Sequence, residues 1–228
     1  MIVGIHQPNY IPWLGFFRKI VQSDIFVLYD NLQMPMGKSF VSRSKVKAPD
    51  GGRWLTVPTP KSGTPKLITE TGVLDGPWLR KHVGSLRNWY TGSPWLDELC
   101  AILEEEVATG HPSIGALNGA ILIRLTRLIG ATDTRFVWAS EMEHGITGAA
   151  SILPILKELG ASVYLTGQGA GSQRYLDEVA FAAEGIETRT LETAFEHYTQ
   201  RHGEFVEGLS ILDAILNIGP VDTFSVIR

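Results

Sequence analysis

The sequence predicts an α/β fold, and two features of its apolar pattern carry this prediction. Short apolar runs suited to buried strands recur along the chain, among them MIVGI, DIFVLYD and SVYLTG. Between the first two runs, WLGFFRKIVQ places its large apolar side chains at helical spacing. A strand, a loop, a helix and a strand in this order are typical of a right-handed parallel crossover. We therefore expect a Rossmann-like three-layer architecture built on a mostly parallel sheet.

The composition is that of a globular protein with a sizeable core. With 228 residues, of which 44% are hydrophobic and 19% charged, the chain is expected to form one domain over residues 1–228. The net charge of -4 disfavours a nucleic-acid partner, which ordinarily requires a basic surface. No leader-like N-terminus and no run of about 18 apolar residues occurs, so we expect a cytoplasmic protein without membrane insertion. The sequence leaves the oligomeric state open.

A β-hairpin excursion is predicted within residues 36–75. The alternating stretches SFVSRSKVKA and RWLTVPT are separated by PDGG, whose residues suit a turn. The two-residue period of a strand places Arg43, Lys45 and Lys47 on one face. Such a basic stripe fits an edge strand that discourages aggregation. It fits equally a face that binds phosphate or carboxylate, and Arg43 suits that role because its guanidinium grips such groups bidentately.

Helical segments follow at residues 77–130, and we interpret them as an insertion. Proline and glycine mark the starts and stops in PWLRKHVGSLRNWY, PWLDELCAILEEEVA and SIGALNGAILIRLTRLIG. Alternation of strand and helix then resumes with RFVWAS, SILPILKELGA and SVYLTG. In the tail, Ser210 and Asp213 fit a helix-capping pair, and Gly219 with Pro220 should end that helix. Because no nucleophile-elbow motif surrounds Ser210, a serine-hydrolase site is disfavoured.

Two loops that follow predicted strands form the expected ligand site. In parallel α/β units, ligands bind at the carboxyl ends of the strands, where helix N-termini and backbone amides can meet anions. The first loop, HQPNYIP at residues 6–12, contains two prolines that fix its backbone. The second, GQGAGSQRYLDE at residues 167–178, is rich in glycine, although its spacing matches neither a dinucleotide fingerprint nor a P-loop.

His6 and Asp30 are the candidate catalytic residues. His6 ends the first strand, and the ordinary histidine pKa of about 6.5 suits a general base or a phosphate contact. Its alternative role is that of a hydrogen-bonded histidine at a strand end. Asp30 ends the second strand on the same predicted rim, where it would orient a hydroxyl, an amine or His6, unless it is an ordinary turn residue. The histidines are scattered without metal-ligand spacing, so no metal site is predicted.

The candidate substrate-binding residues come from the same loops and from the hairpin region. Tyr10 and Trp13 would form a stacking wall for a sugar or a base, unless both are core residues. Basic residues of the hairpin region would balance phosphate or carboxylate charge, and the glycines of the second loop would let its backbone approach a ligand closely. The full set is Gln7, Tyr10, Trp13, Lys38, Arg43, Gly167, Gly169, Gly171 and Tyr175.

Taken together, these segments resemble the WbqC-like protein family of bacteria. The resemblance rests on HQPNYIPWLGFFRKI, DIFVLYD, KSFVSRSKVK, WLTVP, YLTGQGAGSQRYLDE and YTQRHGEFVEGLSILDAILNIG, which follow one another nearly end to end. Members of the family occur in gene clusters for O-antigen and other surface polysaccharides, and in clusters for secondary metabolites. The resemblance implies transfer of glycine or another small acyl group onto an amino sugar.

The expected function is thus a biosynthetic transferase or ligase that attaches a small acyl or aminoacyl group to the amine of an amino sugar, a nucleotide sugar or a related small molecule. Such coupling needs an activated carboxylate, so ATP or an acyl thioester is the expected donor chemistry. The alternative is a non-catalytic ligand-binding or scaffold protein of a biosynthetic complex. Where relatives carry a lysine-threonine pair, this chain has TGAAS at residues 147–151, so Lys38 or Arg43 replaces that lysine or the substrate differs. The opening plan is also similar to that of adenylyl-transferring α/β enzymes, which supports the location of the site only.

Overall fold

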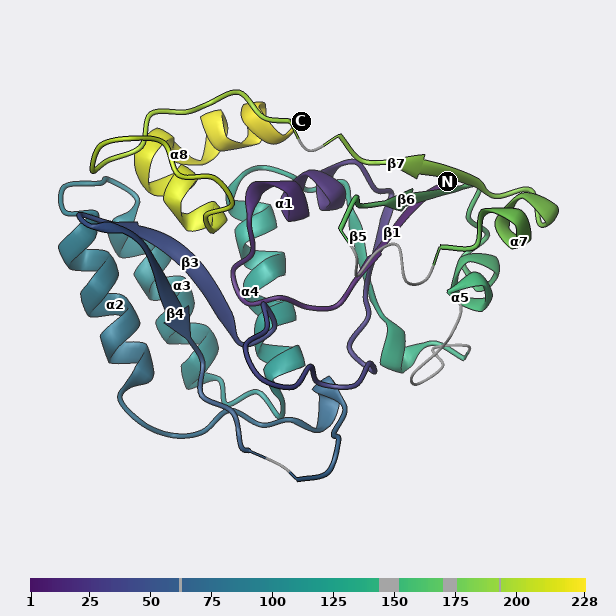
Figure 1. Cartoon of the computed structure of the whole chain (residues 1–228), viewed down its shortest axis with the longest axis horizontal. Coiled ribbons are helices and arrows are strands. Elements are labelled where there is room, and N and C mark those ends of the chain that lie inside the picture. The colour runs from purple at the N-terminus through teal and green to yellow at the C-terminus, as the bar shows by residue number, and fades with distance from the viewer. Residues whose placement is uncertain (62, 144–151, 170–175, 193) are drawn as a thin grey trace.

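A five-stranded parallel sheet forms the centre of the protein (Figure 1). The computed structural model describes residues 1–61, 63–143, 152–169, 176–192 and 194–228. The strands lie in the order β5-β2-β1-β6-β7. Their bounds are β1 (Ile2–His6), β2 (Ile25–Leu28), β5 (Arg135–Trp138), β6 (Val163–Thr166) and β7 (Glu187–Thr190). The α/β class expected from the sequence is confirmed.

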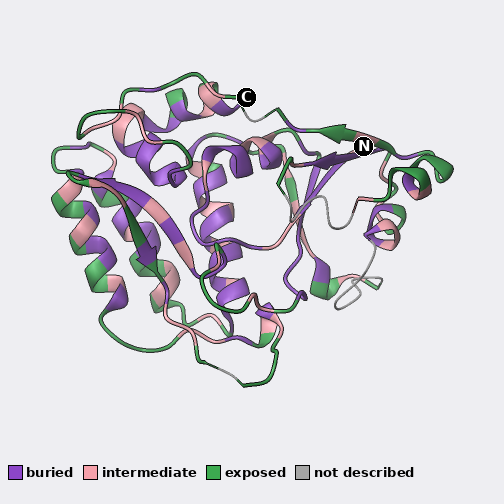
Figure 2. Cartoon of the chain, in the orientation of Figure 1, coloured by how far each residue is buried: buried purple, intermediate pink, exposed green. Residues whose placement is uncertain are grey.

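The burial of the strands follows their position in the sheet (Figure 2). Every residue of β2 and of β6 is buried, as expected of strands covered by helices on both faces. The two outer strands, β5 and β7, contain no fully buried residue. The apolar runs that predicted the inner strands are therefore explained by two-sided packing.

Helices cover this sheet and connect its parallel strands. Helix α1 (Leu14–Val21) joins β1 to β2 and packs against α8 (Ile211–Ile227). Helices α5 (Leu153–Glu158) and α7 (Glu178–Ala183) lie near β6 and β7 (Figure 1). The expected end of the last helix at Gly219 is only partly right: Gly219 has a φ of 83° and breaks the helix, which then resumes. None of the described helices is long and apolar enough to cross a membrane.

The predicted hairpin is confirmed as a separate antiparallel pair, β3 (Arg43–Ala48) and β4 (Gly51–Thr56). Its basic stripe is not uniformly solvated, because Lys47 is only 1% exposed. The ammonium of Lys47 donates hydrogen bonds to Gln200 and to the carbonyl oxygens of Gly203 and Glu204. This lysine therefore ties the hairpin to the C-terminal segment.

Three helices follow the hairpin along the chain. They are α2 (Trp78–Trp89), α3 (Leu96–Ala108) and α4 (Ile114–Leu128), and α3 contacts both of the others. Short 3-10 turns, η1 (Ile68–Glu70) and η2 (Ala139–Glu141), precede α2 and follow β5. In Figure 1 the hairpin and α2 to α4 lie on the left of the sheet, away from α5 and α7.

The strand order changes direction at β1, which has β2 on one side and β6 on the other. Strand β2 pairs with one edge of β1 as far as His6, whereas β6 pairs with the other edge only as far as Gly4 opposite Leu165. A ligand crevice in an open parallel sheet is expected at the carboxyl ends of the strands where the strand order changes direction. The end of β1 beside the end of β6 is such a place.

Candidate functional site

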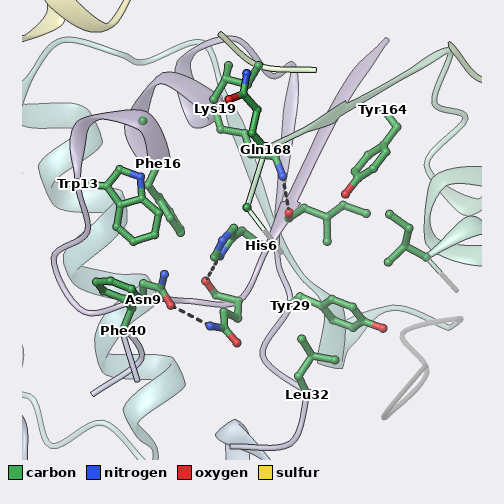
Figure 3. Close-up of a pocket in the computed structure, with 17 residues that line it drawn as sticks. His6, Asn9, Trp13, Phe16, Lys19, Tyr29, Leu32, Phe40, Tyr164 and Gln168 are labelled. Atoms are coloured by element: carbon green, nitrogen blue, oxygen red, sulfur yellow. Dashed lines mark hydrogen bonds between the residues drawn. The ribbon is translucent and has the colours of Figure 1, made fainter. Parts of the chain in front are cut away.

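A pocket of about 480 Å³ lies at the carboxyl ends of β1 and β6 (Figure 3). This volume is typical of small-molecule sites, which are mostly apolar with a few placed polar groups. Apolar side chains from several elements line the pocket, among them Phe16 of α1 and Leu191 after β7. The polar side chains that line it are His6, Gln7, Asn9, Lys19, Tyr29, Tyr164 and Gln168. No carboxylate lines the pocket within the described part of the chain.

His6 ends β1 and is held in one tautomer. Its Nδ1 lies 2.9 Å from the carbonyl oxygen of Gln7. Because a carbonyl oxygen only accepts, Nδ1 carries the proton and Nε2 carries the lone pair. Burial, and then the charge of Lys19, lower the pKa of His6 to about 4, and the hydrogen bond to Gln7 opposes this. The imidazole is thus neutral at pH 7.

Lys19 is a pocket residue that sequence reasoning missed. It belongs to α1, is only 3% exposed, and its Nζ donates a 2.7 Å hydrogen bond to the carbonyl oxygen of Ile5. Burial lowers its pKa to about 7. The available signal was its position three residues after Phe16, within the stripe of α1 that faces the sheet.

Aromatic rings form one wall of the pocket. The ring of Trp13 lies edge-on to Phe40 at a centroid distance of 5.0 Å and to Phe16 at 6.1 Å. The imidazole of His6 is 4.7 Å from the Phe16 ring. Outside the pocket, the ring of Phe40 contacts the ring of Trp54, which is 42% exposed. These rings provide a surface on which the face of a sugar or a base could stack.

The loop after β1 is fixed by hydrogen bonds from distant elements. The side-chain amide of Asn118 on α4 donates to the carbonyl oxygens of Pro8 and Val41, at 2.9 Å and 2.8 Å. The hydroxyl of Ser44 on β3 donates to the carbonyl oxygen of Ile11 at 2.6 Å. Ile11 has a φ of 37°, a conformation unfavourable for a β-branched residue, and it is fully buried. Strain of this kind persists only where the surroundings hold the backbone in place.

A comparison with protein families agrees with the motifs quoted from the sequence. The model of the WbqC-like protein family matches residues 7–224. The chain belongs to the WbqC-like protein family. The match includes Lys19, the second loop and all of the first loop except His6, since it begins one residue after His6.

A curated relative matches this WbqC-like chain over nearly its full length. Uncharacterized protein Rv1507c of Mycobacterium tuberculosis (strain ATCC 25618 / H37Rv) is 29% identical over 225 residues, which cover 95% of this chain and 94% of that protein. No solved structure gives a significant match. The name of this relative states no reaction.

Five of the residues expected to bind or catalyse meet in the pocket of the WbqC-like chain. The structure brings His6, Gln7 and Trp13 together with Gly167 and Gly169. Gln7 also donates to the side chain of Asn9 at 3.2 Å (Figure 3). The ends of two parallel strands thus converge as the sequence predicted.

Gly171, Tyr175 and the segment TGAAS lie outside the described residues.

Tyr10 and Asp30 do not line the pocket. Tyr10 is 1% exposed, and its hydroxyl lies 3.1 Å from Nδ1 of His82 on α2. The carboxylate of Asp30 accepts hydrogen bonds from the backbone N–H and the hydroxyl of Ser140, at 2.9 Å and 2.7 Å. Tyr10 therefore joins the loop to α2, and Asp30 joins the ends of β2 and β5.

The two basic candidates also lie away from the pocket lining. Lys38 is exposed in the segment before β3. The guanidinium of Arg43 lies over the ring of Trp54, with its carbon 4.0 Å from the ring centre. This cation–π contact places Arg43 at the outer end of the aromatic surface that begins with Trp13.

A second pocket adjoins the first. Its volume is about 370 Å³, and it is lined mainly by residues 194–209 of the C-terminal segment. Trp13 and Gly15 line both pockets. Among its lining residues, the imidazole of His197 stacks on Phe205 at a centroid distance of 4.0 Å. The described residues contain no cluster of three or more His, Cys, Asp or Glu side chains that could hold a metal ion.

Proposed function

We propose that this WbqC-like protein transfers a small acyl or aminoacyl group, such as glycine, from an activated donor onto an amine of an amino sugar or a related small molecule. The observation that carries the proposal is the neutral imidazole of His6 in the pocket at the end of β1. Its Nδ1–H is bound to Gln7, so Nε2 is the atom that can accept a proton.

His6 supplies the proton acceptor that amide formation requires. The amine nitrogen attacks the carbonyl carbon of the activated group, so a C–N bond forms. The C–O bond of an acyl-adenylate, made with ATP, or the C–S bond of a thioester breaks, and the leaving group takes the electron pair. The nitrogen loses one proton, which Nε2 of His6 accepts.

The two adjoining pockets offer room for two substrates. A group transfer is fastest when donor and acceptor are held side by side, so that the reacting atoms meet without a further diffusional step. Trp13 and Gly15, which line both pockets, lie at the boundary where such atoms would meet. The aromatic surface of Trp13 and Phe40 suits a sugar ring.

A non-catalytic ligand-binding or scaffold protein is the second candidate. The observation that favours it is the pKa of His6, about 4. A base of this strength accepts protons less readily than one whose pKa lies near the working pH. In this second function the same pocket would hold a ligand without converting it.

Ligand binding and turnover together separate these two functions. A thermal-shift panel of ATP, nucleotide amino sugars, acyl-CoA and glycine would first identify ligands. Ligands that raise the melting temperature would then be combined, with products followed by mass spectrometry and by pyrophosphate release. Transfer is expected at similar rates for the wild type and for Lys81→Met, a change at an exposed site on α2, and about 100-fold more slowly for His6→Asn. Binding without turnover, equal in wild type and His6→Asn, would exclude the enzyme and leave the binding protein.

A further inference from the structure

Lys19 is a buried cation at the edge of the pocket (Figure 3). Only 3% of the residue is exposed. Nζ lies 5.6 Å from the centre of the Tyr164 ring and donates one hydrogen bond, to Ile5. Within the described part of the chain, the other two ammonium hydrogens have no acceptor.

No carboxylate of the chain neutralises this ammonium. The ion pairs formed by the described lysines and arginines do not involve Lys19, and no Asp or Glu lines the pocket there. The residues outside the described part, 62, 144–151, 170–175 and 193, contain neither Asp nor Glu. When Lys19 is charged, a carboxylate that neutralises it therefore has to come from outside the chain.

An ammonium removed from water without an anion costs several kcal/mol, and one backbone carbonyl offsets only part of that cost. An anion in the pocket would offset the rest of this free-energy cost, because attraction between charges is strong where water is excluded. We propose that Lys19 binds the carboxylate of a ligand inside this pocket. The inference rests on the proposed function, since it names the charged group of the substrate held at the same site.

Charge balance favours a carboxylate over a phosphate. Lys19 is the one charged side chain that lines the pocket among the described residues, since His6 is neutral at pH 7. One ammonium balances a monoanion, whereas a phosphate dianion would leave one negative charge unpaired among apolar walls. Phosphate sites ordinarily use several donors or a guanidinium fork, and the described lining contains no arginine.

The binding of an anion by Lys19 should depend on pH. The titratable groups that line the pocket with Lys19 are His6 of β1, Tyr29 after β2 and Tyr164 of β6. Burial raises the pKa of Tyr164 to about 12, so this phenol stays neutral, and His6 titrates only at about pH 4. Arg18, next to Lys19 on α1, donates instead to carbonyl oxygens of the C-terminal segment. Of His6, Lys19 and Tyr164, only Lys19 therefore exchanges its proton between pH 6 and 9.

The sign of the effect follows from the pKa of Lys19, about 7 in the free protein. A bound carboxylate favours the ammonium and raises this pKa. Below pH 7 the lysine is already charged, so the affinity for a carboxylate is constant. Above pH 7 binding must take up a proton, and the dissociation constant should rise about tenfold per pH unit.

The test uses sodium propionate as the probe and propionamide as its uncharged match. Dissociation constants are measured on the full chain at pH 6, 7, 8 and 9 by thermal-shift titration. Propionate is expected to bind more tightly than propionamide at pH 7 and to weaken toward pH 9, while propionamide is unaffected by pH. Inorganic phosphate is the third probe and should bind more weakly than propionate.

Two variants assign the effect to Lys19. Lys19→Met removes the charge at similar length, and Lys19→Gln keeps an N–H donor for Ile5. Both variants should bind propionate about tenfold or more weakly at pH 7, as expected for a lost charge-assisted contact. In both variants the affinity for propionate should no longer depend on pH. Lys81→Met, on the exposed face of α2, should behave as wild type.

The proposal would be overturned if both variants bound propionate as tightly as the wild type does. It would also be overturned if the wild type bound phosphate more tightly than propionate, or did not bind propionate at all. The proposed function fails separately. If propionate binds through Lys19 but no combination of donors and amines gives a product, the carboxylate site stands and the transferase does not. If transfer occurs while Lys19→Met binds carboxylates normally, the transferase stands and the carboxylate site does not.

Discussion

Lys19 and His6 line one pocket, and the positive charge of Lys19 contributes to the low pKa of the His6 imidazole. Two positive charges so close in a buried place oppose one another, so the protonation of one disfavours that of the other. Lys19→Met should therefore raise the pKa of His6 above its wild-type value of about 4. NMR titration of the imidazole resonances measures this. His82, whose pKa burial also lowers to about 4, is not a lining residue of this pocket and should titrate alike in both proteins.

His6→Asn tests the proton acceptor without disturbing the loop. The amide nitrogen of asparagine can replace Nδ1 as the donor to Gln7, but nothing replaces Nε2. We expect a loss of about 100-fold in kcat, the lower end of the range for general-base catalysis, with little change in melting temperature. A variant that keeps more than half of the wild-type kcat would show that Nε2 takes no proton.

The pH profile of kcat/KM should show limits set by both residues. His6 must be neutral, so the acid limb is expected at about pH 4 and not at the ordinary histidine value. If Lys19 must be charged to hold a carboxylate, an alkaline limb appears at about pH 7. In Lys19→Met the alkaline limb should vanish while the residual activity keeps an acid limb. An unchanged alkaline limb in that variant would assign it to another group.

Stability offers a check on Lys19 that needs no substrate. Its pKa is about 7 in the folded protein, below the ordinary lysine value of about 10.4. Between these values the unfolded chain binds more protons, so the contribution of Lys19 to the free energy of unfolding becomes more favourable as pH rises. Lys19→Met should therefore be more stable than wild type at pH 7.

The difference between the two proteins should shrink by about 1.4 kcal/mol per pH unit from pH 7 to pH 9. Urea unfolding of both proteins at pH 7, 8 and 9 measures it. Lys81→Met is the matched control, because an exposed lysine loses little free energy on folding. A constant difference across this range would mean that Lys19 is charged throughout.

The parts of the site that sequence reasoning could find are those fixed by local pattern. Parallel strands end on a common edge, so the predicted strands were enough to bring His6 and Gln7 toward Gly167 and Gly169. The hairpin was likewise predictable from alternation and a turn. These features depend on periods of a few residues, which a single sequence displays directly.

Features that depend on distant residues could not be predicted in this way. Lys19 lies beside Tyr164 of β6, a strand more than 100 residues later in the chain that pairs with β1. A helical lysine is ordinarily solvated, and its position in an apolar stripe was the one local sign. Asp30 was expected to orient a hydroxyl, an amine or His6, unless it is an ordinary turn residue. Its carboxylate accepts hydrogen bonds from Ser140, a partner that depends on where the end of β5 lies.

Asn118 is another such residue, and its role can be tested directly. Its amide nitrogen donates to the carbonyl oxygens of Pro8 and Val41, and the residue is fully buried. Asn118→Asp keeps the size but replaces the donor by an acceptor, so both carbonyl oxygens lose their partner and a charge is buried. We expect a loss of about 3 kcal/mol or more in the free energy of unfolding.

Asn118→Leu separates the missing hydrogen bonds from the buried charge. It leaves the carbonyl oxygens of Pro8 and Val41 without a donor but adds no charge, so a smaller loss of about 1 to 3 kcal/mol is expected. Because Pro8 lies two residues after His6, ligand affinity should fall in this variant even at temperatures where it is folded. Urea unfolding and thermal-shift titration on the same samples measure both effects. Wild-type ligand affinity in a folded Asn118→Leu protein would show that the loop holds its shape without this residue.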